Sequence, residues 1–260
     1  MQALLEMSVM KSCLLLIGLV SFPAVGWADL EIDPKNWKVT LPLPNEKGGA
    51  LEVTNPDFER YLADPDSIPG EHARFFRREG GAMIFYCPTG GATTKNTDYP
   101  RSELREMGGD AGENEYEWTL MEGGALEFRF KVGPFEEGAE KLMFAQIHGH
   151  EPESKVLLKC LWHKGHLRIM GKSGEKLKDF EVQQRYLPLN EGEWYTCRIE
   201  ASEEAVSVAM DGVVIETFGR EVLKYWPVDN TYYFKAGNYL QERKEGSAAT
   251  VSISHISVSH

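Results

Sequence analysis

The sequence contains few cysteines, which excludes a small fold held together by many disulfides. One of its 4 cysteines, Cys13, lies in an apolar N-terminal stretch, which leaves Cys87, Cys160 and Cys197 in the rest of the chain. An odd set of three allows at most one disulfide within the chain, and the spacing does not choose the pair. No Cys/His spacing is typical of a zinc site, so we expect neither a metal nor another cofactor.

Positive charge is also scarce. The chain has 28 Lys and Arg against 40 Asp and Glu, a formal net charge of -12. Such an acidic protein is a poor match for the backbone of a nucleic acid or for an anionic membrane surface. We therefore expect no nucleic-acid and no membrane partner, and we expect the protein to act as a monomer. If its ligand is a polyanion, the positive charge that binds it must be concentrated locally.

The sequence lacks a hydrophobic run long enough to cross a membrane: an apolar N-terminal stretch is too short, and no later segment approaches the required length. That stretch runs from Cys13 to Val20, follows Lys11 and precedes small residues that end at Ala28. These features are typical of a secretory signal peptide that is cleaved after Ala28. We expect an exported protein, extracellular or periplasmic, with residues 1–28 removed and residues 29–260 forming one domain.

Long stretches of helical periodicity are absent as well. Only Asn55 to Ala63 and Arg220 to Tyr225 have short helical patterns, and turn residues separate many short β-rich runs elsewhere. The runs are Trp37 to Leu41, Ala82 to Tyr86, Ala125 to Val132, Lys141 to His148, Lys155 to Trp162, His166 to Met170, Trp194 to Ala201, Val206 to Met210, Val213 to Thr217 and Thr250 to Val258. This pattern predicts an all-β sandwich of antiparallel strands. Asp211-Gly212, between two runs, predicts a type I′ hairpin.

Three of the expected strands have one polar face. Side chains two apart in a strand share a face, and the motifs PRSELREM, FAQIHGH and YYFKAGNYLQ then give three polar sets. These sets are Arg101, Glu103 and Arg105; Gln146 and His148; and Tyr233, Lys235, Gly237, Tyr239 and Gln241. Alone, the first set would be read as a solvated face with an ion pair. A glycine in mid-strand indicates either a bulge or the close approach of a ligand, so the three sets together favour a groove.

The motifs PRSELRE, QIH and YFKAGNYLQ, in that order, resemble the three signature motifs of polysaccharide lyase family seven, the alginate lyases. The earlier stretches WKVTLPLP and FYCPTGGATT are also similar to that family, so the resemblance covers the chain from Trp37 to its end. It implies a β-jelly-roll of two antiparallel sheets with a concave substrate groove. It also implies cleavage of 1,4-linked uronates, as in alginate, by β-elimination to products with an unsaturated end.

The resemblance also implies roles for individual residues. Arg101 and Gln146, helped by His148, would contact the carboxylate of the sugar at the cleavage point, and Tyr239 would protonate the leaving oxygen O4. The chemistry agrees, because elimination requires a neutralised carboxylate, a base and an acid. A guanidinium can hold a carboxylate with two hydrogen bonds, which an ammonium cannot. The remaining set would bind the substrate or orient its partners: Arg105, Lys235 and Gln241 hold neighbouring sugars, and Glu103 orients Arg101 and Arg105 rather than acting as a base.

The identity of the base depends on the sugar. In mannuronate the C5 hydrogen and O4 lie on the same side of the ring, so Tyr239 could serve as base and acid in turn. In guluronate they lie on opposite sides, so His148 would be the base. In the resembled family, isoleucine in the middle of QIH accompanies activity on guluronate-containing blocks, and Ile147 therefore predicts guluronate or mixed blocks as the preferred substrate.

Other interpretations remain open from the sequence. The stretch ENEYEW, Glu113 to Trp118, offers carboxylates two apart as in some glycoside hydrolases, but an acidic edge or loop is the favoured interpretation. A non-catalytic carbohydrate-binding jelly-roll would depend on aromatic platforms and would not need the Gln-x-His and Tyr-x-Lys faces. A lyase of the same fold that acts on another polyuronate, such as glucuronan, would share the chemistry, and only a panel of substrates separates it from an alginate lyase.

Overall fold

The structure is a computed structural model, and it describes residues 30–95, 97–108, 112, 114–183 and 187–260. The expected signal peptide, residues 1–28, lies outside the described residues. Within them, none of the helices has the length and apolar character needed to cross a membrane.

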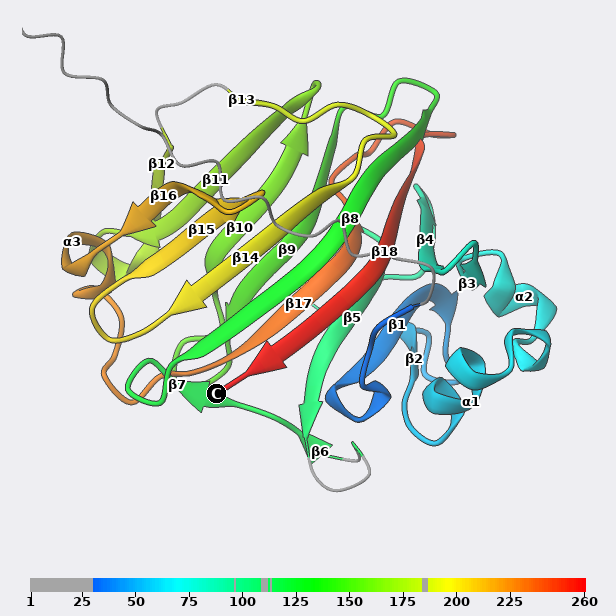
Figure 1. Cartoon of the computed structure of the whole chain (residues 1–260), viewed down its shortest axis with the longest axis horizontal. Coiled ribbons are helices and arrows are strands. Elements are labelled where there is room, and N and C mark those ends of the chain that lie inside the picture. Colours follow the sequence, from blue (N-terminus) through cyan, green and yellow to red (C-terminus); the bar gives the residue numbers. More distant parts are fainter. Residues whose placement is uncertain (1–29, 96, 109–111, 113, 184–186) are drawn as a thin grey trace, which may run out of the picture.

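Two antiparallel sheets make up the described part of the chain (Figure 1). Eleven of the described strands form the larger sheet, whose main path runs β12-β11-β10-β9-β17-β5-β1-β2. The strands of the larger sheet are β1 (Trp37–Pro44), β2 (Ala50–Val53), β5 (Arg101–Gly108), β6 (Asn114–Glu115), β7 (Trp118–Thr119), β9 (Lys141–Gly149), β10 (Val156–His163), β11 (His166–Ser173), β12 (Asp179–Val182), β13 (Leu187–Pro188) and β17 (Thr231–Leu240).

Seven described strands form the second sheet, in the order β16-β15-β14-β8-β18-β4-β3. They are β3 (Phe76–Glu79), β4 (Ala82–Pro88), β8 (Gly124–Glu136), β14 (Tyr195–Ala201), β15 (Val206–Met210), β16 (Val213–Phe218) and β18 (Ala248–Ser259). The α-helices are short: α1 (Asp57–Ala63), α2 (Gly70–Ala73) and α3 (Arg220–Leu223).

This architecture confirms the expected sandwich. β15 has the predicted bounds, and β16 begins where it was expected. The turn between them has positive φ at both central residues, 50° at Asp211 and 78° at Gly212, as a type I′ hairpin requires. The helix expected over Asn55 to Ala63 begins two residues later, and the sequence did not predict the short strands β2, β3 and β12. Four-residue strands contain too few residues to show a period.

The core lies between the two sheets and is rich in aromatic side chains. Phe130 from the second sheet stacks on Phe144 from the larger one, with ring centroids 4.5 Å apart, and both are fully buried. Burying such a ring stabilises the fold by about 1.5–3 kcal/mol. Cys160 on β10 and Cys197 on β14 are both fully buried in the same core. Together with Cys87 they are buried free thiols, so none of the three forms a disulfide.

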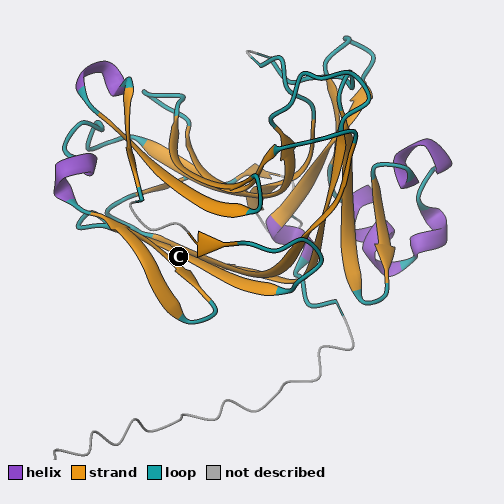
Figure 2. Ribbon diagram, turned by 90° about the horizontal axis from the view of Figure 1, so that it is seen from above, coloured by secondary structure: helices purple, strands orange, loops and turns teal. Residues whose placement is uncertain are grey.

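The outer face of the larger sheet is concave. In Figure 2 the two layers curve together, and the hollow side of the larger sheet is open at the top of the view. A groove of about 620 Å³ lies on this face, and residues from β1, β5, β9, β10 and β17 line it. The sandwich therefore buries one face of the larger sheet in the core and leaves the other face for a ligand.

Candidate active site

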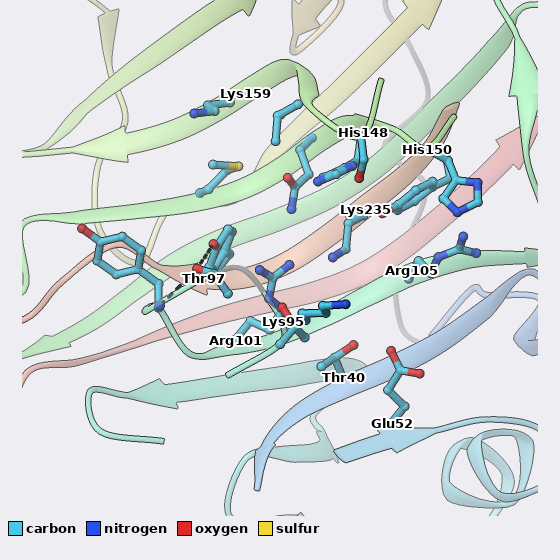
Figure 3. A pocket seen from close by; sticks show the side chains of 18 of the residues that line it. Thr40, Glu52, Lys95, Thr97, Arg101, Arg105, His148, His150, Lys159 and Lys235 are labelled. Carbon is cyan, nitrogen blue, oxygen red and sulfur yellow. Dashed lines mark hydrogen bonds between the residues drawn. The ribbon is translucent and has the colours of Figure 1, made fainter. Parts of the chain in front are cut away.

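Strand pairing brings the three polar motifs side by side on the concave face. β17 lies between β9 and β5, and in the pairing Lys235 is opposite Gln146 on one side and Arg105 on the other. Tyr239 is opposite Arg101 in the same way. All of the predicted polar residues except Glu103 line the groove, and Figure 3 shows Arg101, Arg105, His148 and Lys235 grouped at its centre.

Glu103 lies beneath this group and holds it together. Its side chain is fully buried, and its Oε2 accepts from Arg101 Nη1 at 3.0 Å and from Lys235 Nζ at 2.9 Å. Its Oε1 accepts from Gln146 Nε2 at 2.6 Å. One carboxylate thus fixes a residue from each of the three motifs, which agrees with an orienting role. Glu103 is fully buried and does not line the groove, so it is badly placed to take a proton from a substrate.

Electrostatics keeps Glu103 charged. Burial alone would raise the pKa of Glu103, but the charges of Lys235 and Arg101 and the hydrogen bonds from Lys235 and Gln146 hold it below its usual value. Burial also lowers the pKa of Lys235 to about 8, with the charge of Arg101 acting in the same direction. The result is a positive cluster with one internal carboxylate, and this cluster is suited to a second carboxylate from a ligand.

Tyr239 lies at the edge of the cluster with its hydroxyl facing the groove. The hydroxyl shares a hydrogen bond of 2.6 Å with Thr97 Oγ1, drawn as a dashed line in Figure 3. The guanidinium carbon of Arg101 lies 3.8 Å from the centroid of the tyrosine ring. The hydroxyl thus lies on the groove, beside the guanidinium that can receive a carboxylate, where it can exchange a proton with a bound ligand.

His148 is arranged as a neutral base. Its Nδ1 lies 2.6 Å from the carbonyl oxygen of Gly149, and because a carbonyl only accepts, Nδ1 carries the hydrogen and Nε2 keeps its lone pair. Burial lowers the pKa of His148 to about 4, and the nearby charge of Lys235 adds to this effect. Tyr233 stacks on the ring, with centroids 5.3 Å apart, and holds its orientation. The imidazole is therefore in its neutral form at neutral pH, with its one hydrogen on Nδ1.

Arg105 has different partners from those expected. Glu103 does not orient it; instead Arg105 Nη2 lies 3.1 Å from Glu115 and 3.5 Å from Glu117, while Nη1 donates to the carbonyl of Glu106 at 2.7 Å. Its guanidinium also lies over the ring of Tyr233, 4.0 Å from the centroid. The difference arises because Glu103 is already bound by Arg101, Gln146 and Lys235. The carboxylates nearest to Arg105 are instead those of Glu115 and Glu117. Glu115, from the acidic stretch that the sequence placed at an edge or loop, thus lines one end of the groove.

Three buried polar atoms near the cluster lack a hydrogen-bond partner within the described part of the chain: Arg101 Nε, Gln146 Oε1 and Gln241 Nε2. Two of them are donors. Gln146 Nε2 also has a second hydrogen besides the one given to Glu103. Buried donors without partners are rare in folded proteins, so these atoms indicate a site whose ligand supplies the acceptors.

Gly237 is explained by a bulge and by the packing of two strands. Its φ is 136°, and a Cβ placed there would lie 2.9 Å from Glu103 Cα and from the carbonyl oxygen of Ser102. β17 stays in register with β5 at this point but shifts against β9 between Ala236 and Tyr239. Of the two explanations the sequence left open, the bulge applies, and the close approach is that of β5.

Several residues that contact the site had no predicted role. Thr97 is in a loop, and nothing in its neighbourhood shows that it reaches Tyr239. Tyr233 lies on the predicted polar face of β17, so the period-two pattern was a usable signal for it. Lys38, on β1, pairs with Glu52 at 2.8 Å and with Glu115 at 2.7 Å, and all three residues line the groove. Among the described residues no group of three or more His, Cys, Asp or Glu side chains could hold a metal ion.

Comparison with known proteins agrees with this geometry. The family model described as alginate lyase matches residues 29–260. The chain belongs to the alginate lyase family. Over 106 residues it is 32% identical to an alginate lyase of Klebsiella pneumoniae, a match that spans 40% of this chain and 32% of that relative. The chain thus matches about a third of the length of this curated relative.

Solved structures of polysaccharide lyase family 7 have the same fold. Alginate lyase AlgAT5 is 27% identical, with a TM-score of 0.69 over 87% of this chain and 94% of that one. Alginate lyase A1-II′, in complex with a product (GGG), is 26% identical, with a TM-score of 0.73 over 88% of this chain and 97% of that one. The jelly-roll fold and the family expected from the three motifs are therefore confirmed.

Proposed function

We propose that this protein is an exported lyase that cleaves alginate by β-elimination. The observation that carries the proposal is the fully buried Glu103, which fixes Arg101, Gln146 and Lys235 in one cluster beside Tyr239 and His148. Such a cluster combines a fixed carboxylate receptor with two groups that can exchange protons. A non-catalytic sugar-binding protein would not need a neutral histidine and a tyrosine at the same receptor.

In the proposed reaction, the uronate carboxylate at the cleavage point lies against Arg101 and the second hydrogen of Gln146 Nε2. Their charge and hydrogen bonds stabilise the enolate that forms when the C5 proton leaves. The electron pair of the C5–H bond becomes the C4=C5 double bond as the C4–O4 bond breaks. Tyr239 gives its proton to O4, and the products are a new reducing end and an unsaturated uronate.

The base differs between the two sugars of alginate. For guluronate, where the C5 hydrogen and O4 are on opposite sides, His148 Nε2 takes the proton and Tyr239 gives one. The low pKa of His148, about 4, means that this base is ready at neutral pH. For mannuronate, Tyr239 acts as base and then as acid, and the cationic Arg101 over its ring assists the first step.

Alginate with guluronate-containing or mixed blocks is the proposed substrate. Two features support this choice. A relative, alginate lyase A1-II′, was captured with a substrate (GGMG) after a His→Asn and a Tyr→Phe replacement, and the same two residue types face this groove. Ile147 is fully buried in the core, so its effect can only be to position the strand that carries Gln146 and His148.

The test is an ultraviolet assay for unsaturated uronate on polyguluronate, mixed-block alginate, polymannuronate and glucuronan at equal uronate concentration. We expect product with alginate, and faster initial rates on guluronate-containing blocks than on polymannuronate. Tyr239→Phe should lower kcat by at least about 100-fold, because the acid for O4 is lost. Tyr225→Phe is the matched control, because Tyr225 is 39% exposed and is not among the residues lining the groove.

The outcomes separate the alternatives. Product from glucuronan alone would assign the protein to another polyuronate, and binding without product would make it a carbohydrate-binding jelly-roll. A correctly folded Tyr239→Phe variant that keeps more than a few per cent of the wild-type rate would contradict the mechanism. Export is tested separately by N-terminal sequencing of the secreted protein, which should begin at Asp29.

A further inference from the structure

A second group of cations lies on the concave face, beyond the cluster that Glu103 holds. The Nζ atom of Lys159 on β10 lies 4.4 Å from the ring centroid of Phe180 on β12, and that of Lys172 on β11 lies 3.9 Å from the same centroid. All three side chains are half-buried. We call Lys159, Lys172 and Phe180 the outer shelf.

The outer shelf continues a row of groups that crosses the larger sheet. In the strand pairing Lys38, Arg105, Lys235, Gln146 and Lys159 follow one another across β1, β5, β17, β9 and β10. Lys159 lies two strands beyond Lys235, which at about 4.8 Å per strand is roughly 10 Å. Lys159 lines the same groove as His148 and Lys235, and Figure 3 shows it at the opposite end from Glu52.

Charge differs between the two ends of this row. At the β1 end, carboxylates neutralise both cations: Glu52 and Glu115 pair with Lys38, and Glu115 and Glu117 pair with Arg105. At the β10 end, neither Lys159 nor Lys172 forms an ion pair with an acidic side chain of the described residues. A polyanion in the groove would thus meet repulsion at one end and unneutralised cations at the other.

The positive charges of Lys159 and Lys172 repel each other when no anion lies between them. Burial lowers the pKa of Lys159 to about 8, and the charges of Lys172 and Lys141 add to this effect. Burial likewise lowers the pKa of Lys172, and the charge of Lys155 adds to this effect while the charge of Asp179 opposes it. The ring of Phe180 holds both ammonium groups in place through its negative face. An anion placed between them would relieve the repulsion and gain two charge-assisted hydrogen bonds.

We propose that the outer shelf is a binding subsite for the carboxylate of a further uronate residue, with Lys159 and Lys172 as its ligands and Phe180 as the residue that positions them. This subsite rests on the proposed function, since it needs a polyuronate in the groove. A polymer bound at this subsite would extend from the cleavage point toward β10 and β11, away from Glu115. Short oligomers that do not reach the shelf gain nothing from it.

The experiment measures KM and kcat for Lys159→Gln, Lys172→Gln and the double variant on oligouronates of increasing length. The matched control is Lys131→Gln, because Lys131 also lies over an aromatic ring, 5.1 Å from the centroid of Trp194, but on the second sheet. We expect each shelf variant to raise KM about fivefold on long oligomers, with kcat retained. On the shortest oligomer that is cleaved, wild type and shelf variants should have the same KM.

A KM that is unchanged at every length, or one that rises equally at every length, would overturn the subsite. A loss of kcat at all lengths would also overturn it, because the lysines would then act on the cleavage point. The proposed function can fail separately. If the wild type releases no unsaturated product, calorimetric titration with polyguluronate still tests the shelf, and the double variant must then bind more weakly than Lys131→Gln for the subsite to stand.

Discussion

Glu103 is negatively charged in a position with no exposure to solvent, and this is tolerable only because three donors surround it. An isolated buried charge would cost several kcal/mol, and in such a case the group takes up a proton instead. Here Lys235 and Arg101 hold the pKa of Glu103 low, so the carboxylate stays an acceptor. Its consequence for function is preorganisation, since Arg101 and Gln146 need not reorient when a substrate arrives.

At the same scale, the shape of Arg101 matters as well as its charge. Arg101 Nη1 is committed to Glu103 while Nε lacks a partner among the described residues, so the guanidinium serves two carboxylates at once. A lysine ammonium lacks the planar arrangement of N–H groups that lets Nη1 bind Glu103 while Nε faces a second carboxylate. Arg101→Lys should therefore lower kcat/KM by roughly 10- to 100-fold, as expected for one lost hydrogen bond to a charged group.

Steady-state kinetics on alginate checks this, with Arg198→Lys as the control because Arg198 pairs with exposed Glu200 on the second sheet. If Arg101→Lys retained the wild-type kcat/KM, the guanidinium would be acting only as a distant charge. Circular dichroism of both variants shows whether the fold is kept.

At the scale of the element, the decisive feature is the order β9, β17, β5. The period of two predicted correctly which residues of each strand share a face, because alternation is a local property of an extended chain. It did not predict that Glu103 would hold Gln146 rather than Arg105, because that depends on register and on which strands are neighbours. Lys159 and Thr97 were missed for the same reason: each reaches the groove through long-range pairing or a loop, and neither belongs to a polar motif.

Gly237 tests the packing of β17 against β5. Gly237→Ala adds a Cβ that would lie 2.9 Å from the backbone of Glu103 and Ser102, at a φ of 136°. Gly212→Ala is the control. Gly212 also has a positive φ, of 78°, but no atom lies within 4 Å of a Cβ placed there. The positive φ alone costs an alanine about 1–2 kcal/mol at either position. Gly237→Ala adds the close contact with β5, so it should lower the free energy of unfolding more than Gly212→Ala does in urea titrations. Equal losses would show that the contact with β5 relaxes freely.

At the scale of the whole molecule, charge is distributed unevenly. The chain has a formal net charge of -12, yet Arg101, Lys235, Lys159 and Lys172 gather on one concave face. The positive charge is therefore concentrated locally, as expected if the ligand is a polyanion. The acidic remainder keeps other polyanions away from the rest of the surface, while the field inside the groove draws a negatively charged chain along it.

The last residue, His260, links the stability of the whole molecule to pH. Its Nε2 lies 2.6 Å from Glu106 Oε1, and Glu106 also accepts from Trp118 Nε1 at 3.1 Å and from the backbone of Phe234 at 2.8 Å. Burial alone would lower the pKa of His260, but the hydrogen bond and charge of Glu106 outweigh it and raise that pKa above its usual value. The protonated histidine thus fastens the C-terminus to both β5 and β17 on the core side of the larger sheet.

A histidine whose pKa is raised on folding stabilises the protein fully below its unfolded pKa of about 6.5, and this contribution disappears as the pH rises through the folded pKa. The difference in unfolding free energy between wild type and His260→Gln should therefore be larger at pH 6 than at pH 9. Urea titrations at the two pH values measure it. His163→Gln is the control, because burial lowers the pKa of His163, and its difference should therefore not be larger at pH 6 than at pH 9. A His260→Gln difference that is constant, or that grows with pH, would mean that His260 packs against Glu106 in its neutral form.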